Sequence, residues 1–228
     1  MKLLRRHRLA HLSAQGWTQV LARPWDSEGK ACIAHWAERG LPLVVTRQHE
    51  LATAHEETVL LGLPAPTQWG RRRLGLQVPR SAILCFGEFP RANEVLHLLP
   101  RDARAAWHRL ATAFEMERVQ VRAYGSYGWQ QLTGLRYVHP GSDLDLWIAV
   151  DDARHADFMA ACLQAQAPGR LRLDGELVFR DGSAVNWREW SAWRAGHSRS
   201  VLVKHVCGAR LETSAFVPED SQEMGLAA

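Results

Sequence analysis

Hydrophobic and polar positions in the second half of the chain repeat with periods that predict alternating helices and strands. Apolar residues from 102 to about 118 recur at helical spacing, and Asp102 at the start of this segment predicts an N-cap. A second helix is expected over residues 153–166. Strands are expected over 119–124, 143–150 and 171–179, and a strand or a helix over 201–206. This succession predicts an α+β fold with a mixed sheet flanked by helices.

The first part of the chain has a different pattern, with two short apolar runs on either side of a turn-rich stretch. The β-branched run 41–46 and the alternating run 74–78 each predict a strand. Between them, residues 62–70 contain two prolines and two glycines, which excludes a regular helix. Proline and glycine interrupt the pattern again just before residue 90. We therefore predict a small N-terminal α/β unit over residues 1–90 and a second domain over residues 91–228.

Composition and charge narrow the class of protein. The 228 residues are 46% hydrophobic and 23% charged, with a net charge of +4, so the chain has enough apolar residues for a real core and disorder is excluded. Only three of the 28 basic residues are lysine, and the other 25 are arginine. Because the planar arginine fork binds phosphate and carboxylate in two-point fashion, this bias favours anionic partners. Codon bias over a solvated surface is the alternative explanation.

The cysteines and the first residues of the chain indicate in which cellular compartment the protein is expected. The four cysteines, Cys32, Cys85, Cys162 and Cys207, show neither zinc-site spacing nor a disulfide framework. The basic start of the chain is not followed by the apolar core of a signal peptide, and no window has the length of a membrane helix. We expect a soluble, cytoplasmic protein that has no membrane partner.

One constellation carries the chemistry that the sequence predicts. Gly125 and Ser126 follow a predicted strand, and Asp143 and Asp145 begin another strand. Strand alternation places the two carboxylates on one face, about 6.5–7 Å apart along the strand. Their mutual repulsion favours a cation between them, and Mg²⁺ or Mn²⁺ is the hard ion that accepts carboxylate together with phosphate oxygens. Gly125 and Ser126 are expected to hold a phosphate through backbone N–H groups and a hydroxyl.

A third carboxylate is expected on the strand that runs through residues 171–179. Asp174 is the first choice and Glu176 the second, and both lie on one face of that strand. Either side chain could complete a metal site or accept the proton of an attacking hydroxyl.

Other basic and aromatic residues have both functional and structural readings. Arg71, Arg72 and Arg73 follow a turn, where they either neutralise a phosphate chain or form a solvated charge run. Lys204 lies in an apolar run, where a lysine is costly unless it contacts a phosphate or a carboxylate of the site. Tryptophans recur every third residue on one predicted helix face, which favours packing over an adenine-stacking wall: Trp187, Trp190 and Trp193.

The order of these motifs resembles the nucleotidyltransferase superfold over roughly residues 100–210. That resemblance implies attack of a hydroxyl on an α-phosphorus, with diphosphate leaving. A narrower resemblance, to the malonate decarboxylase holo-acyl-carrier-protein synthases, extends over nearly the whole chain. It rests on segments 42–45, 61–64, 71–73, 136–147, 173–177 and 181–190.

The narrower resemblance implies a specific reaction. The donor would be 2′-(5″-triphosphoribosyl)-3′-dephospho-CoA, and the acceptor a serine of the apo acyl carrier subunit of malonate decarboxylase. In the pattern of the superfold, Gly125 and Ser126 hold the phosphates of the donor, while Asp143 and Asp145 hold the metal. Two alternatives remain: a nucleotidyltransferase acting on a small molecule or on the citrate lyase carrier protein, and a basic nucleic-acid-binding module. No recognisable nucleic-acid motif supports the second alternative.

Overall fold

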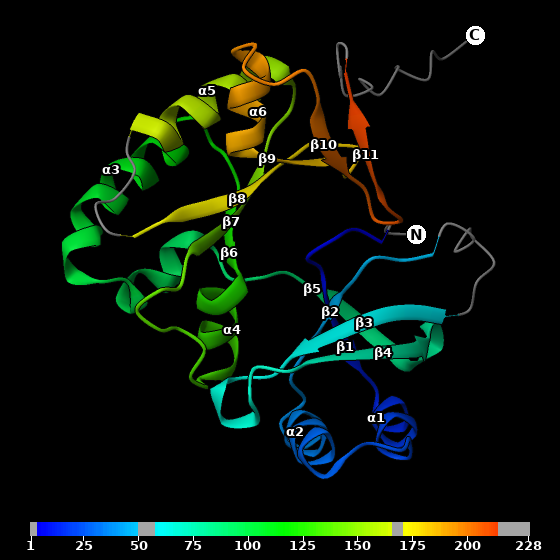
Figure 1. The fold of residues 1–228 in the computed structure, drawn as a ribbon. Coiled ribbons are helices and arrows are strands. Elements are labelled where there is room, and N and C mark those ends of the chain that lie inside the picture. Colours follow the sequence, from blue (N-terminus) through cyan, green and yellow to red (C-terminus); the bar gives the residue numbers. More distant parts are fainter. Residues whose placement is uncertain (1–3, 50–57, 166–170, 214–228) are drawn as a thin grey trace, which may run out of the picture.

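The fold consists of two β-sheets, each covered by helices on one side. The structure, a computed structural model, describes residues 4–49, 58–165 and 171–213. The helices α1 and α2 lie on the outer side of the first sheet, and α3, α5 and α6 lie on the outer side of the second (Figure 1). The predicted α+β class, with a mixed sheet flanked by helices, is confirmed.

The first sheet has five strands in the order β4-β3-β2-β1-β5, and all neighbouring strands are antiparallel. In β3 and β4 every second side chain is buried, because these strands place one face against α1 and α2. Ser13 and Asp26 cap the two helices through their side-chain oxygens. The elements are β1 (Leu9–Leu12), α1 (Ala14–Leu21), α2 (Ser27–Glu38), β2 (Leu43–Val45), β3 (Thr58–Pro64), η1 (Thr67–Trp69), β4 (Arg73–Pro79), η2 (Arg80–Ala82) and β5 (Ile83–Gly87).

The second sheet has six strands in the order β11-β10-β9-β8-β7-β6. Only β7 and β8 are parallel, and the helix α5 connects them as a crossover. The elements are η3 (Ala92–Leu98), α3 (Arg101–Met116), β6 (Val121–Tyr124), α4 (Gly125–Thr133), β7 (Leu144–Ala149), α5 (Ala153–Ala165), β8 (Leu173–Val178), β9 (Ala184–Asn186), α6 (Trp187–Arg194), β10 (Val201–Lys204) and β11 (Ala209–Glu212).

The second sheet has one apolar face and one polar face. Leu144, Leu146 and Ile148 of β7 are fully buried in the core under α3, α5 and α6, as their alternation with the aspartates predicts. The residues between them point to the opposite face, toward the first sheet. This division by strand parity places the predicted carboxylates, Asp145 of β7 and Asp174 of β8, between the two units.

Several local expectations need correction. The stretch 62–70 is not wholly a turn, because β3 extends through Pro64 and pairs with β4 over its whole length. Asp102 is not the N-cap of its helix: α3 begins at Arg101, and Asp102 lies in its first turn, where a carboxylate is favourable beside the helix dipole. Of the two alternatives predicted for residues 201–206, the structure has the strand, which ends at Lys204.

Backbone and side-chain hydrogen bonds join the two units directly. The N–H of Gln48 donates to the carbonyl of Val206 over 2.8 Å, and the N–H of Thr67 donates to the carbonyl of Arg136 over 3.1 Å. The hydroxyl of Tyr137 donates to the carbonyl of Pro64 over 2.7 Å. These contacts hold the ends of the first sheet against loops of the second unit.

Gly175 should be essential for the pairing of β7 and β8. A Cβ at this position would lie 2.2 Å from the carbonyl oxygen of Leu146, its register partner in the parallel ladder. We expect Gly175→Ala to lower the free energy of unfolding by about 2 kcal/mol or more, measured by urea denaturation. Gly75→Ala is the control, because a Cβ there meets no atom within 4 Å. Equal stabilities of the two variants would contradict this account.

Candidate functional site

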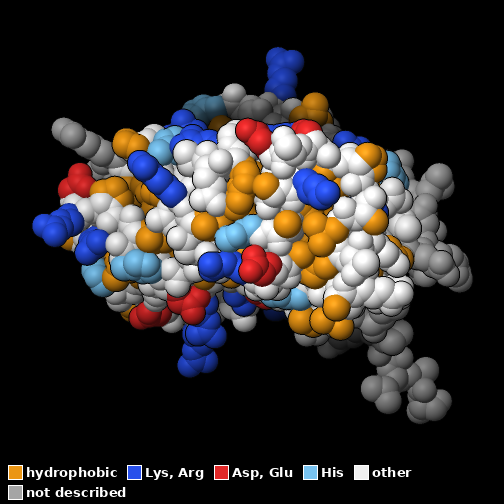
Figure 2. Space-filling model, turned by 90° about the horizontal axis from the view of Figure 1, so that it is seen from below, with side chains coloured by type: hydrophobic (Ala, Val, Ile, Leu, Met, Phe, Trp, Pro, Cys, Tyr) orange, Lys and Arg blue, Asp and Glu red, His pale blue; other side chains and the backbone are white. Residues whose placement is uncertain are grey.

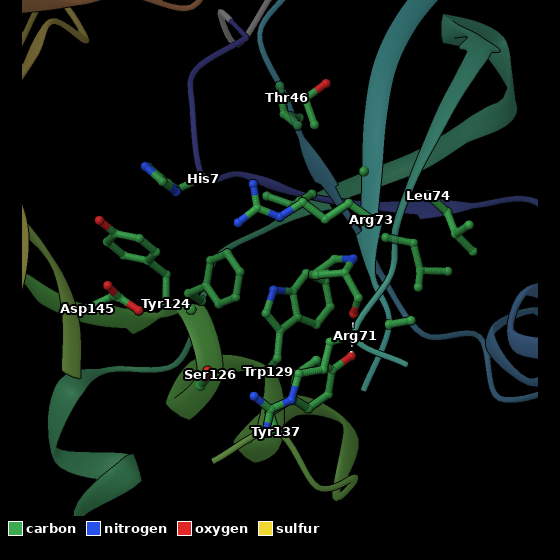
Figure 3. A pocket seen from close by; sticks show the side chains of 18 of the residues that line it. His7, Thr46, Arg71, Arg73, Leu74, Tyr124, Ser126, Trp129, Tyr137 and Asp145 are labelled. Atoms are coloured by element: carbon green, nitrogen blue, oxygen red, sulfur yellow. Dashed lines mark hydrogen bonds between the residues drawn. The ribbon is translucent and has the colours of Figure 1, made fainter. Parts of the chain in front are cut away.

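A cavity of about 690 Å³ lies between the first sheet and the polar face of the second. Thr46, Arg73 and Leu74 line it from the strands of the first unit, while Tyr124, Ser126 and Asp145 line it from the second (Figure 3). Its volume is that of a pocket for a ligand of cofactor size. The elements that the sequence predicts to hold phosphate and metal therefore meet the N-terminal unit in one pocket.

The turn at Gly125 and Ser126 connects β6 directly to α4. Gly125 has a φ of 58°, and a Cβ on it would lie 1.8 Å from Oδ2 of Asp145, so only glycine fits here. Tyr124 at the N-cap makes no side-chain capping bond. The first N–H groups of a helix have no partner within it, so this turn offers donors for an anion beside the Asp145 carboxylate.

The strands β7 and β8 bring three carboxylates to this end of the pocket. Asp145 and Asp174 are direct neighbours in the parallel ladder. Asp174 accepts hydrogen bonds from the N–H of Gly175 over 2.8 Å and from the side-chain amide of Asn186 over 2.7 Å. Asp143, just before β7, forms an ion pair with Arg172 at 2.8 Å. Asp145 therefore lies beside Asp174 and close enough to Asp143 for both charges to act on it, and of these three carboxylates only Asp145 lines the pocket.

Burial and like charge act together on Asp145. Burial, followed by the neighbouring carboxylates of Asp174 and Asp143, raises the pKa of Asp145 to about 7, and Arg172 opposes the shift only in part. A carboxylate with this environment favours a positive charge beside it. Within the described ranges, no group of three His, Cys, Asp or Glu side chains is arranged as a complete set of metal ligands. A cation at Asp143 and Asp145 would therefore need further oxygen ligands, of the kind that a phosphate chain carries.

Glu176 has a different role from the one considered for it. Its side chain is only 5% exposed, and three basic side chains contact it: Lys204 at 2.9 Å, His7 at 3.0 Å and Arg6 at 3.3 Å. Burial alone would raise the pKa of Glu176, but the hydrogen bond and charge of His7, the charge of Arg6 and the hydrogen bond of Lys204 lower it to about 2. Glu176 is thus neutralised by the protein itself, which leaves Asp174 as the carboxylate beside Asp145.

Of the four cationic residues predicted to bind the substrate, the structure places two in the pocket lining and two outside it. Arg71 and Arg73 line the pocket, with Arg71 in the left-handed region at a φ of 55°. Arg72 does not line it: both guanidinium arms bind the carboxylate of Asp26, the N-cap of α2, on the outer side. Lys204 also lies outside the pocket lining, because its ammonium group contacts Glu176. Of the two contacts predicted for Lys204, a phosphate or a carboxylate of the site, the structure therefore has the carboxylate.

The sequence analysis missed several pocket residues. The ring of Tyr124 packs against that of His7 in a tilted arrangement, with ring centroids 4.2 Å apart. Burial, followed by the charges of Glu176 and Asp145, raises the pKa of Tyr124 well above the usual value. Trp129 on α4 stacks on Tyr137. The pocket lining also contains Arg6, His7 and Arg47. The basic run at residues 5–8 is the feature of the sequence that could have indicated Arg6 and His7.

The tryptophan series 187–193 is part of the core and not a wall of the pocket. Trp187 and Trp190 are buried where α6 packs against α5 and the second sheet, and the indole N–H of Trp190 donates to Asp157. The aromatic side chains that do face the pocket come from other elements, namely Phe89, Tyr124, Trp129 and Tyr137. Packing, the structural reading of the series, is confirmed.

The arginine excess is mostly spread over the surface. On the face that carries α1 and α2, Lys and Arg side chains are scattered among apolar and acidic ones and form no single patch (Figure 2). None of the helices in the described residues is long and apolar enough to span a membrane. Four arginines nevertheless gather at the pocket, which is where anion binding is expected: Arg6, Arg47, Arg71 and Arg73.

Carboxylates beside an anion-binding helix turn, in a basic pocket, define a class of enzymes that transfer phosphate-linked groups. Residues 5–89 match the N-terminal domain, and residues 91–215 the C-terminal domain, of the family described as phosphoribosyl-dephospho-CoA transferase MdcG. The chain belongs to this family of transferases.

Curated relatives agree with the family assignment. The chain is 35% identical to a phosphoribosyl-dephospho-CoA transferase of Bradyrhizobium diazoefficiens over 205 residues, which cover 88% of this chain and 86% of the relative. It is 35% identical to the enzyme of the same name from Xanthomonas campestris pv. campestris over 216 residues, 94% of this chain and 97% of the relative. No solved structure matches the chain.

The low pKa of Glu176 predicts how stability depends on pH. Because the pKa is lowered from 4.5 to about 2 on folding, the ionised carboxylate stabilises the fold above pH 4.5, and this contribution is lost as the pH falls toward 2. We expect wild type to exceed Glu176→Gln by about 3 kcal/mol in free energy of unfolding at pH 7. Urea denaturation at pH 7 and pH 3.5 should show the difference shrinking at the lower pH. A difference that stays constant between these two values would refute the assignment.

Proposed function

We propose that this protein transfers the phosphoribosyl-dephospho-CoA group from 2′-(5″-triphosphoribosyl)-3′-dephospho-CoA to a serine of the apo acyl carrier subunit of malonate decarboxylase. Diphosphate is the second product. One observation carries the proposal: Asp145 lies between the Gly125 turn and Asp174, at one end of a basic pocket built from both matched domains. The names of the curated relatives support the donor group.

The residues of the pocket have distinct tasks in this reaction. The Ser126 hydroxyl and the N–H groups that begin α4 bind the triphosphate, and Arg71 and Arg73 offset further negative charge of the donor. Asp143 and Asp145 would hold Mg²⁺ or Mn²⁺, which would supply electrophilic activation of the phosphate and stabilise the leaving diphosphate. The raised pKa of Asp145 fits such a cation, because a nearby positive charge would favour its ionised form.

The chemical step is a substitution at phosphorus. The serine oxygen of the carrier subunit forms a bond to the α-phosphorus, and the bond from this phosphorus to the diphosphate oxygen breaks. Asp174 accepts the serine proton in this scheme, held in place by its hydrogen bond from Asn186. The cytoplasm is the proposed compartment, which suits the four free cysteines.

Intact mass of the carrier subunit tests the acceptor directly. Incubation with the donor, Mg²⁺ and this protein should add one phosphoribosyl-dephospho-CoA group to the malonate decarboxylase subunit and none to its variant lacking the acceptor serine. Preferred modification of the citrate lyase carrier protein would instead assign the other acceptor. A gain of AMP from ATP would identify a plain adenylyltransferase.

Replacement of a single metal-binding carboxylate should abolish transfer while the fold persists. We expect Asp143→Asn and Asp145→Asn each to lower the transfer rate at least about 10³-fold, because each removes charge stabilisation of several kcal/mol. Asp151→Asn is the matched control, since Asp151 is exposed, pairs with Arg180 and follows the opposite end of β7 from Asp143. Rates within tenfold of wild type in either site variant would exclude the proposed metal ligands.

A further inference from the structure

Two glycines face each other on the side of the first sheet that lines the pocket. Gly62 of β3 and Gly75 of β4 are direct register partners in the middle of a seven-residue antiparallel pairing. Glycine in the interior of a strand costs about 0.5–1 kcal/mol relative to alanine. Such a residue often marks a place where a ligand approaches the backbone closely. We call this pair the glycine platform.

Packing explains one member of the glycine platform but not the other. A Cβ on Gly62 would lie 2.8 Å from Cγ2 of Thr46, so a side chain there would collide with β2. A Cβ on Gly75 would meet nothing within 4 Å, and its φ does not lie in the left-handed region. Neither sterics nor backbone conformation therefore requires glycine at position 75. What a side chain there would fill is the pocket itself.

The surroundings of the glycine platform combine apolar surface with positive charge. Val44 and Pro64 lie beside it on the strands, and Trp129 lines the same cavity from α4 (Figure 3). Arg71 and Arg73 line this side, and over the described part of the chain no ion pair engages either of them. Among the described residues that line the cavity, the only carboxylate is Asp145, contributed by the second unit. A flat, bare surface rimmed by unpaired guanidinium groups suits a planar ring that carries phosphate.

We infer that the glycine platform binds the adenosine of the donor, with Arg71 and Arg73 on the 5′-diphosphate that connects adenosine to the pantetheine arm. This inference rests on the proposed function, since it names the part of that donor which the N-terminal unit recognises. The transferred phosphate lies at the Gly125 turn and the adenosine at the strands, within one cavity of about 690 Å³. Gly75 is then a specificity-determining position, because any larger side chain occupies the space of the ring.

Binding of dephospho-CoA to the full chain tests the inference, because this probe carries the adenosine and diphosphate but no triphosphate. Isothermal titration should show that Gly75→Leu raises its Kd at least about tenfold, through occupation of the platform. Gln77→Leu is the matched control: it lies two residues further along the same face of β4, is exposed, and does not line the pocket. We expect its Kd to stay within about twofold of wild type. Circular dichroism melting of both variants confirms that each is folded.

Two further arms separate the possible outcomes. ADP should respond to Gly75→Leu as dephospho-CoA does, whereas a response of phosphopantetheine alone would assign the platform to the pantetheine arm and overturn the inference. Unchanged binding by Gly75→Leu, or no binding of dephospho-CoA by wild type, overturns it too. If dephospho-CoA binds as expected while no carrier protein is modified, the platform stands and the proposed acceptor falls.

Discussion

The carboxylate of Glu176 lies buried between the two sheets, and the shape of the pocket depends on the basic side chains that contact it. A buried charge is costly unless it is paired, so Glu176 of β8 needs basic partners from other segments of the chain. Arg6 and His7 supply them from the segment that precedes β1, and Lys204 supplies a third from β10. This contact places the first residues of the N-terminal unit against the strand that also carries Asp174. The ring of His7 also packs against Tyr124, which directly precedes the Gly125 turn.

Alternate residues on the strands of the second sheet have different roles, because one set packs in the core and the other set faces the first unit. On β7, Leu144, Leu146 and Ile148 complete the core, whereas Asp145 points into the pocket. The parallel partner β8 repeats this division, and Gly175 lets the two strands approach closely enough for Asp174 to lie beside Asp145. Because the apolar half of each strand is held rigidly by helices, the carboxylates are presented on a fixed support. The raised pKa of Asp145 is the electrostatic consequence of that convergence.

The two units contribute different chemistry to one pocket. The second supplies carboxylates and a helix N-terminus, which suit a phosphate chain that is undergoing substitution. The first supplies arginines and a sheet face bare of side chains, which suit the part of a ligand that does not react. Binding energy gained far from the reacting atoms can position them.

Local pattern in the sequence was sufficient for the α+β class and most elements of the second half, because those strands and helices follow clear periods of two and 3.6 residues. It also predicted Gly125, Ser126 and Asp145, which line the pocket, and Asp174, which lies beside Asp145 on the next strand. The chemistry that predicts each of them is contained in a short stretch of sequence. It did not predict α1 or α2, and Gly62 and Pro64 obscured the end of β3.

The tertiary structure decided which charges meet. Nothing in the sequence distinguishes Arg71, Arg72 and Arg73. In the fold, Arg72 binds Asp26 and therefore does not line the pocket. Asp174 and Glu176 share a strand face, and it is the distant Arg6, His7 and Lys204 that neutralise one of them and not the other. The motifs were therefore determined by the sequence alone, because they depend on neighbours along the chain. The pairing of charges and the pocket were decided by the fold, because they depend on residues that lie from 28 to 170 positions apart.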